Sequence, residues 1–320
     1  MLPRRNQRPQ WLRTAILAVL IHASLFAQPG GPPKSPKAID EEVAGVMKST
    51  GAQGLALAFI ENGQVAYVQS YGRRNAAGDA LGTTTIMYGA SLTKAAFAYM
   101  VMQLADEKLI DLDASISRYL PKPLPEYPTE EKYAPWVGLK GDERWRKVTP
   151  RILLTHSSGL PPFAFVEPDG RLRFHFDPGA RYAYSGEGFI LLQFVLEKGL
   201  GLDVGREVQR RVFDRFHMTN TSMMWRPEFA ANLADGWDEQ GRVEAHDERS
   251  KVRAAGSMDT TIADMARLAA GYVRGDGLSS RARADLTRPQ FRFGRQASSH
   301  HSNRNCRPRA NTQAWRPGSA

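Results

Sequence analysis

The spacing of hydrophobic and polar residues predicts one β-hairpin and a series of helices. Residues 54–60 and 65–71 are short β-type runs, and the Asn62-Gly63 pair between them is a strong hairpin signal. We therefore expect a hairpin edge combined with a mostly helical insert. Helical patterns cover residues 39–50, 91–108, 148–155, 188–198, 204–216 and 261–274.

Cap and turn residues mark the ends of these elements. Thr149 precedes Pro150 at the start of one helix, and Thr261 with Asp264 predicts a capping box at the start of another. Residues 121–135 contain five prolines, which predicts an extended surface loop. Residues 83–90 are expected to form another loop.

Composition excludes several classes of protein. Apolar residues make up 42% and charged residues 24% of the 320 positions, which excludes disorder, collagen and multiple membrane spans for the bulk of the chain. Cys306 is the single cysteine in the sequence. An internal disulfide and a cysteine-based zinc or iron–sulfur cluster are therefore excluded.

The formal net charge of +10 comes from the two ends of the chain. Residues 1–13 and 287–320 together hold eleven arginines and no acidic residue. Residues 14–286 hold 32 basic and 33 acidic side chains, a net charge of about −1. A nearly neutral body is not a nucleic-acid footprint, so we expect no nucleic-acid partner.

Residues 1–27 have the pattern of an export signal, with a basic start and an apolar run interrupted by His22. The run is too short to be a stable span of a hydrocarbon layer of ~30 Å, and no cysteine follows it for lipid attachment. We expect cleavage after Ala27, a linker over residues 28–37, and a periplasmic or secreted protein. An uncleaved anchor and a misread start codon are the alternatives.

The C-terminal end changes character near Gln290. Residues 291–320 contain no acidic residue and no Leu, Ile or Val. Such a segment buries too little apolar surface to offset the entropy cost of ordering it. We expect a disordered basic tail beyond a single domain of residues 38–290.

Ser91 and Lys94 form the first candidate for chemistry. A serine at a helix start and a lysine three residues later share one helix face. The helix N-terminus stabilises negative charge on the serine and disfavours charge on the lysine, which could then act as a base. By itself the pattern is common, with roughly 0.65 matches expected by chance. Without further support, a helix cap beside a solvated lysine is the preferred interpretation.

Three further segments support the Ser91/Lys94 candidate. Residues 152–160 (ILLTHSSGL) end a helix in a glycine loop, and residues 177–189 (DPGARYAYSGEGF) carry tyrosines before another helix. Residues 254–264 (AAGSMDTTIAD) lead into the last predicted helix. In this order and spacing, the four segments resemble the serine β-lactamase-related family, which includes class C β-lactamases, D-alanyl-D-alanine peptidases and related esterases.

This resemblance implies an α+β fold of the β-lactamase/transpeptidase type, with an antiparallel sheet packed with helices and a mostly helical subdomain. It implies that Ser91 is the acylated nucleophile and that Lys94 shares its proton. Tyr184 matches the tyrosine of the family's Tyr-x-Asn motif, which relays a proton to the leaving group and needs a depressed pKa that Lys94 can supply. The asparagine position is Gly186 here, so we expect β-lactam amide recognition to suffer more than ester hydrolysis. Tyr182 is the competing tyrosine, with spacing that fits the family pattern less well.

We interpret the other candidate residues as structural. We interpret His156 as a structural hydrogen bonder rather than a base, and His246 as part of a solvated loop. His300 and His301 lack partners at metal-ligand spacing. The chain has no Gly-x-Ser-x-Gly elbow, phosphate loop or dinucleotide fingerprint. No metal or organic cofactor is expected.

The family's third motif is missing from the sequence. After Arg274 there is no Lys-Thr-Gly or His/Trp-x-Gly triplet and no alternating apolar strand. We therefore expect the second oxyanion donor to be absent, one edge of the hairpin to be open, and the chain to be truncated or frame-shifted near residue 290.

Two functions follow from these observations. The first is an exported, monomeric serine hydrolase that forms an acyl-enzyme with a small ester, amide, β-lactam or peptidoglycan-like substrate. The second is a catalytically impaired or non-catalytic relative that binds ligands or has no function.

Overall fold

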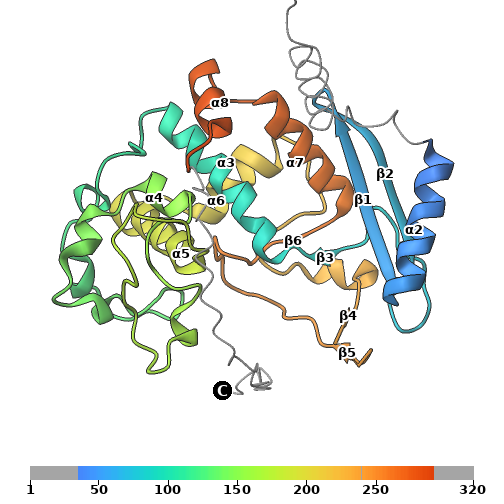
Figure 1. The fold of residues 1–320 in the computed structure, drawn as a ribbon, viewed down its shortest axis with the longest axis horizontal. Helices are drawn as coiled ribbons and strands as arrows, with labels where there is room; N and C mark the ends of the chain where they lie inside the picture. Colours follow the sequence, from blue (N-terminus) through green and yellow to red (C-terminus); the bar gives the residue numbers. More distant parts are fainter. Residues whose placement is uncertain (1–34, 239, 292–320) are drawn as a thin grey trace, which may run out of the picture.

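A β-hairpin stands beside a largely helical body in the computed structural model, which describes residues 35–238 and 240–291 (Figure 1). Strands β1 (Gly54–Glu61) and β2 (Gln64–Gly72) pair antiparallel, from Gly54 opposite Gly72 to Glu61 opposite Gln64. Asn62 and Gly63 both have positive φ, 52° and 74°, as a tight two-residue hairpin turn requires. The predicted hairpin is confirmed.

Two helices hold the hairpin. α2 (Pro36–Thr50) begins at the cap residue Ser35, and its Asp40 accepts hydrogen bonds from the hydroxyls of Tyr67, at 3.1 Å, and Tyr71, at 2.7 Å. α7 (Ile262–Arg274) packs against both strands, and Arg274 donates to the carbonyl oxygen of Gly63 at 2.5 Å. α7 therefore joins the hairpin to the body (Figure 1).

The core of the body surrounds α3 (Thr93–Asp106) and α5 (Gly186–Phe194), both of which are largely buried. The helices predicted over residues 188–198 and 204–216 are present, each in two parts. α5 continues into the π-helical turn η7 (Val195–Gly199), and α6 (Val204–Val208) continues into the π-helical turn η8 (Gln209–Phe213).

The proline-rich segment 121–135 is not the extended surface loop that we expected. Leu124 is fully buried in the 3-10 turn η3 (Leu124–Glu126). Tyr127 and Tyr133 are both buried, and each packs edge-on against Phe194 with ring centroids 4.9 Å apart. Prolines prevent regular helix and strand, but they leave neighbouring side chains free to enter a core.

Several short elements complete the body. β3 (Met87–Tyr88) lies within the expected loop and pairs with β6 (Asp259–Thr260), while β4 (Gly236–Trp237) pairs with β5 (Val243–Glu244). α8 (Ser280–Thr287) was not predicted. The remaining 3-10 turns are η2 (Ile116–Arg118), η4 (Trp136–Leu139), η5 (Glu143–Lys147), η6 (Ala164–Val166) and η9 (Pro227–Asn232).

The predicted helix caps hold in part. Thr149 Oγ1 accepts from Ile152 N at the start of α4 (Pro150–Leu154), and Thr261 Oγ1 accepts from Asp264 N at the start of α7. In a capping box, the Asp264 carboxylate would accept from the backbone N–H of Thr261. It accepts instead from Asn220 N at 2.8 Å and Thr221 Oγ1 at 2.9 Å. Tertiary partners have replaced the local one.

Within residues 35–238 and 240–291, β1 has β2 as its one strand partner, and the residues after Thr260 form helices and turns without a strand. The open hairpin edge that we expected is thus seen for this part of the chain. The expected tail apart from its first residue, Phe291, the signal segment and most of the linker lie outside the described residues. Of the helices in the described part, none has the length and apolar character to cross a membrane.

Candidate active site

Ser91 lies in the 3-10 turn η1 (Ala90–Leu92), which leads directly into α3. The predicted helix over residues 91–108 therefore begins two residues later and ends at Asp106. Ala90 has a φ of 41°, a left-handed conformation that alanine rarely adopts. This backbone turns the chain just before Ser91, whose side chain is exposed.

The segment before β6 fixes this turn from outside. Gly89 N donates to Met258 O at 2.8 Å, and Met258 N donates to Thr93 Oγ1 at 3.0 Å. Thr93 Oγ1 donates in turn to Ala90 O at 2.5 Å. The 254–264 motif thus holds the serine turn in place, a function that its sequence alone did not reveal.

Lys94 and Tyr184 both reach the hydroxyl of Ser91. Lys94 Nζ donates to Ser91 Oγ at 3.1 Å and to the carbonyl oxygen of Ala255 at 2.5 Å, and its side chain is buried. Tyr184 Oη and Ser91 Oγ are 2.6 Å apart, close enough for a hydrogen bond in either direction. The structure therefore brings the three predicted site residues together.

Electrostatics favour an ionisable Tyr184. Partial burial opposes ionisation, but interactions with Lys94 and the hydrogen bond with Ser91 outweigh it, so the pKa of the Tyr184 phenol lies below its usual value. The Lys94 ammonium also lies 5.0 Å from the centroid of the Tyr184 ring. This direction agrees with the one expected from the sequence.

His156 supports Tyr184 from behind. Its Nδ1 accepts a hydrogen bond from Ser185 N at 3.1 Å, and its ring stacks on that of Tyr184 with centroids 4.6 Å apart. Burial, followed by the charge of Lys94, lowers the pKa of His156, so the ring is neutral at pH 7 and can accept this bond. His156 is thus a structural hydrogen bonder, as predicted.

The competing tyrosine, Tyr182, lies beside His156, with ring centroids 5.9 Å apart. The phenol that bonds to Ser91 belongs to Tyr184. His246, however, is not in a solvated loop. It packs against Trp225 at 4.7 Å between ring centroids, and its Nε2 lies 3.4 Å from a carboxylate oxygen of the fully buried Asp259.

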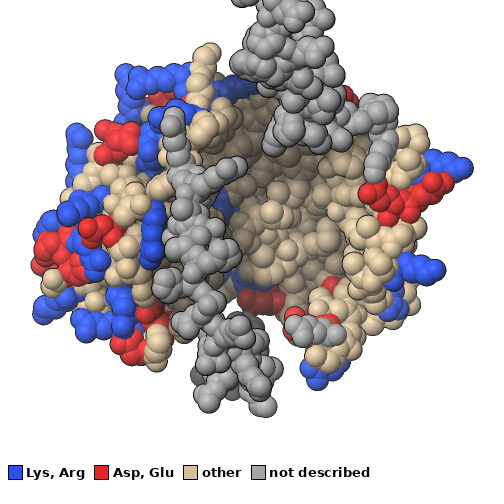
Figure 2. Space-filling model, viewed as in Figure 1, with Lys and Arg blue, Asp and Glu red and all other residues tan. Residues whose placement is uncertain are grey.

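A cleft of about 580 Å³ opens at Ser91. One wall carries Phe163, Phe165 and Ile190, and charged residues of the segment 247–253 also line the cleft. Elsewhere on the molecule, Figure 2 shows charged side chains mainly at the periphery of one face, with a largely uncharged hollow between the helical body and the hairpin. Sequence reasoning missed Phe163 and Phe165, because neither belongs to one of the recognised segments.

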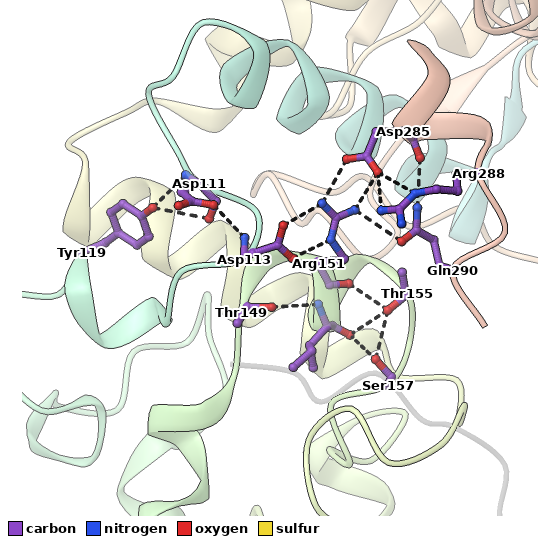
Figure 3. Close-up of polar contacts among 11 residues, drawn as sticks. Asp111, Asp113, Tyr119, Thr149, Arg151, Thr155, Ser157, Asp285, Arg288 and Gln290 are labelled. Carbon is purple, nitrogen blue, oxygen red and sulfur yellow. Dashed lines mark hydrogen bonds and ion pairs between the residues drawn. The ribbon is translucent and has the colours of Figure 1, made fainter. Parts of the chain in front are cut away.

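A larger cavity of about 870 Å³ lies between the end of α3 and α8. Arg151 lines this cavity, and its guanidinium bonds to Asp113 and Asp285, while Arg288 and Gln290 also bond to Asp285 (Figure 3). Arg151, Arg288, Asp113 and Asp285 are occupied with one another, and no serine in the described part of the chain lines this cavity. We therefore place the candidate active site at Ser91.

The arrangement at Ser91 suits nucleophilic chemistry. A hydroxyl bonded to both an amine and a phenol can lose its proton to one of them as it attacks a carbonyl carbon. Among the described residues, no three His, Cys, Asp or Glu side chains gather closely enough to hold a metal ion.

Solved structures show the same fold. One neighbour is an octameric penicillin-binding protein homologue from Pyrococcus abyssi, with a TM-score of 0.61 and 22% identity, covering 78% of this chain and 59% of that one. Another is the D-alanine carboxypeptidase AmpC from Burkholderia cenocepacia, with a TM-score of 0.61 and 21% identity, covering 78% of this chain and 67% of that one. The expected β-lactamase/transpeptidase-like fold is confirmed.

The class defined by this fold and site is that of serine hydrolase-like proteins. The model of the Beta-lactamase family matches residues 39–306, and the chain belongs to this family. The family predicted from the sequence is confirmed.

Two curated relatives match only part of this chain, at low sequence identity. Monacolin J acid methylbutanoyltransferase from Aspergillus terreus is 30% identical over 169 residues, which are 46% of this chain and 40% of the relative. Putative beta-lactamase-like 1 from Homo sapiens is 25% identical over 249 residues, 74% of this chain and 49% of the relative. The matched part is thus less than half the length of either relative.

Proposed function

We propose that this chain is an exported serine hydrolase that forms an acyl-enzyme on Ser91. The observation that carries the proposal is the placement of one exposed serine hydroxyl within hydrogen-bond distance of both Lys94 Nζ and Tyr184 Oη, at a cleft. Relatives named as a methylbutanoyltransferase and a D-alanine carboxypeptidase support acyl chemistry.

In the proposed reaction, Ser91 Oγ attacks the substrate carbonyl carbon while its proton passes to Lys94 Nζ or to Tyr184 Oη. The bond from that carbon to the leaving group breaks, and Tyr184 returns a proton to the departing oxygen. Water then attacks the acyl-enzyme and releases the acid and Ser91. Gly186 offers no side-chain amide to orient a substrate amide, so esters are the favoured substrates.

A chromogenic short-chain ester tests the proposal. We expect turnover by the full chain and loss of turnover in Ser91→Ala, together with a covalent label on Ser91 from a fluorophosphonate. Equal background hydrolysis by both proteins would instead support the second function, a non-catalytic relative that binds ligands. That alternative draws on the absence of a strand after Thr260 in the described part of the chain.

We also propose export through residues 1–27. The basic start and the short apolar run support it. Production in a Gram-negative host followed by N-terminal sequencing of the periplasmic protein should give a chain that begins at Gln28. Recovery of the intact Met1 chain from the cytoplasm would contradict the proposal.

A further inference from the structure

The cleft at Ser91 has one strongly apolar wall. Phe163 and Phe165 stack with ring centroids 5.2 Å apart and ring planes within 8° of each other. Phe165 is 73% exposed, the highest exposure of any large hydrophobic residue that the structure describes. An aromatic ring left in water beside a nucleophile is a surface that a ligand can cover with a gain in free energy.

This wall is fixed to the helix that follows Tyr184. Pro162 O accepts hydrogen bonds from Gly186 N at 2.8 Å and Glu187 N at 3.1 Å. Glu187 Oε1 accepts a further hydrogen bond from Ala164 N at 2.6 Å. The segment 162–165 is therefore held in a defined position relative to the proton relay.

Gly186 makes room for the ring. A Cβ at position 186 would lie 2.6 Å from Phe163 Cε1 and 2.7 Å from Pro162 O, both far inside contact distance. A side chain at this position would displace the ring or the backbone. The aromatic wall therefore depends on the absence of a side chain at position 186.

Charged residues also line the cleft, and two of its cations are paired with acids. Arg249 bonds to Asp259 at 2.5 Å, and Lys251 forms an ion pair with Glu131. Arg253 donates to the backbone carbonyl of Glu131 at 3.0 Å. Arg249 and Lys251 are thus already paired with acids, whereas the ring of Phe165 is left uncovered and offers apolar surface to a ligand.

We propose that Phe163 and Phe165 form a platform that binds an apolar group, aliphatic or aromatic, attached to one side of the scissile ester bond. The inference rests on the proposed hydrolase function and specifies its substrate class. It predicts that esters with longer apolar chains are preferred to acetyl esters of small alcohols.

Two ester series test which side of the bond the platform takes. The first series is p-nitrophenyl acetate, butyrate and hexanoate, and the second is methyl, butyl and phenyl acetate. We expect kcat/KM to rise by about 10-fold along one series, since each buried methylene favours binding by a few-fold. In Phe165→Ala that rise should shrink by about 5-fold. Phe59→Ala, which removes an exposed phenylalanine on β1, is the matched control and should keep the wild-type rise.

Binding to a non-reactive protein separates this inference from the proposed function. Equilibrium dialysis should show that Ser91→Ala binds p-nitrophenyl hexanoate or phenyl acetate about 5-fold more tightly than the double variant Ser91→Ala/Phe165→Ala. If this difference in affinity is seen but the wild type shows no turnover, the proposed hydrolase function is wrong and the platform is supported. A wild-type enzyme whose preference and binding are both insensitive to Phe165→Ala would overturn the platform.

Discussion

Lys94 is buried and has two oxygen neighbours, the hydroxyl of Ser91 and the carbonyl of Ala255. The carbonyl accepts one of its protons, which leaves the amine aimed at the serine. A base at this position must be able to give up a proton and regain it. The residue type at position 94 therefore matters more than its positive charge.

Lys94→Arg should abolish acylation of Ser91, because arginine cannot be deprotonated in a protein. Labelling of Ser91 by a fluorophosphonate, read by mass spectrometry, measures this. Lys132→Arg, at a lysine paired with Glu197, is a control that should label normally. Undiminished labelling of the Lys94 variant would remove the lysine from the mechanism.

Tyr184→Phe should lower kcat by roughly 10²–10⁴, the usual contribution of a positioned acid or base. Tyr182→Phe keeps the ring that contacts His156 and should change kcat little. Ester hydrolysis by the two variants in parallel gives the ranking. A larger loss in the Tyr182 variant would mean that the relay had been assigned to the wrong tyrosine.

At the scale of elements, the start of α5 connects the relay to the aromatic wall. Ser185 caps the helix by accepting from Gly188 N at 2.9 Å and donates to Pro161 O at 2.9 Å. Glu187, in the first turn, holds Ala164 N with one carboxyl oxygen, while the other is buried without a hydrogen-bond partner among the described residues. This helix start thus carries a buried, half-satisfied carboxyl group next to the site.

Burial raises the pKa of Glu187 to about 7, although the Ala164 hydrogen bond and the charge of Arg253 both oppose the rise. A raised carboxyl pKa contributes stability that is fully present below the unfolded value near 4.5 and is lost as pH rises through 7. The difference corresponds to on the order of 3 kcal/mol. Between pH 5 and pH 8, the wild-type free energy of unfolding should therefore fall.

Glu187→Gln keeps an acceptor for Ala164 N and removes the titration. We expect this variant to gain stability over the wild type as pH rises from 5 to 8, by up to about 3 kcal/mol in urea unfolding. Glu61→Gln, at an exposed position on β1, should follow the wild-type curve. Parallel pH dependences for wild type and Glu187→Gln would show that Glu187 is ionised in the folded protein without cost.

At the scale of the whole molecule, the hairpin depends on α7 for its attachment to the body. In the described part of the chain, the outer edge of β1 has no strand partner, and Phe59 on this strand is 48% exposed. An open edge with apolar side chains is a site for pairing between copies. We therefore expect the isolated protein to self-associate.

Phe59→Lys places a charge on this edge and should shift light scattering of the isolated protein toward the monomer, because a lysine on an edge strand opposes pairing. Val137→Lys adds the same charge at an exposed position of the helical body and should have no such effect. Unchanged association in Phe59→Lys would locate the contact elsewhere.

Local sequence determined much of this protein. The hairpin followed from Asn62-Gly63, because a two-residue turn with positive φ needs those residue types. The starts of α4 and α7 followed from Thr149 and Thr261, which bond to backbone atoms three residues away. The four segments also sufficed to indicate the family and to name Ser91, Lys94 and Tyr184. Each of these inferences depends on short-range chemistry or on a recognised pattern.

Tertiary structure decided the rest. Proline content could not show that Leu124, Tyr127 and Tyr133 enter the core, because burial depends on Phe194, which lies far along the chain. The sequence could not show either that the Asp264 carboxylate bonds to Asn220 and Thr221 rather than to the helix start, because these partners are also distant along the chain. The aromatic wall beside Ser91 is the clearest case. Gly186 signals only a missing amide in the sequence, and the folded chain alone shows that the ring of Phe163 occupies that space.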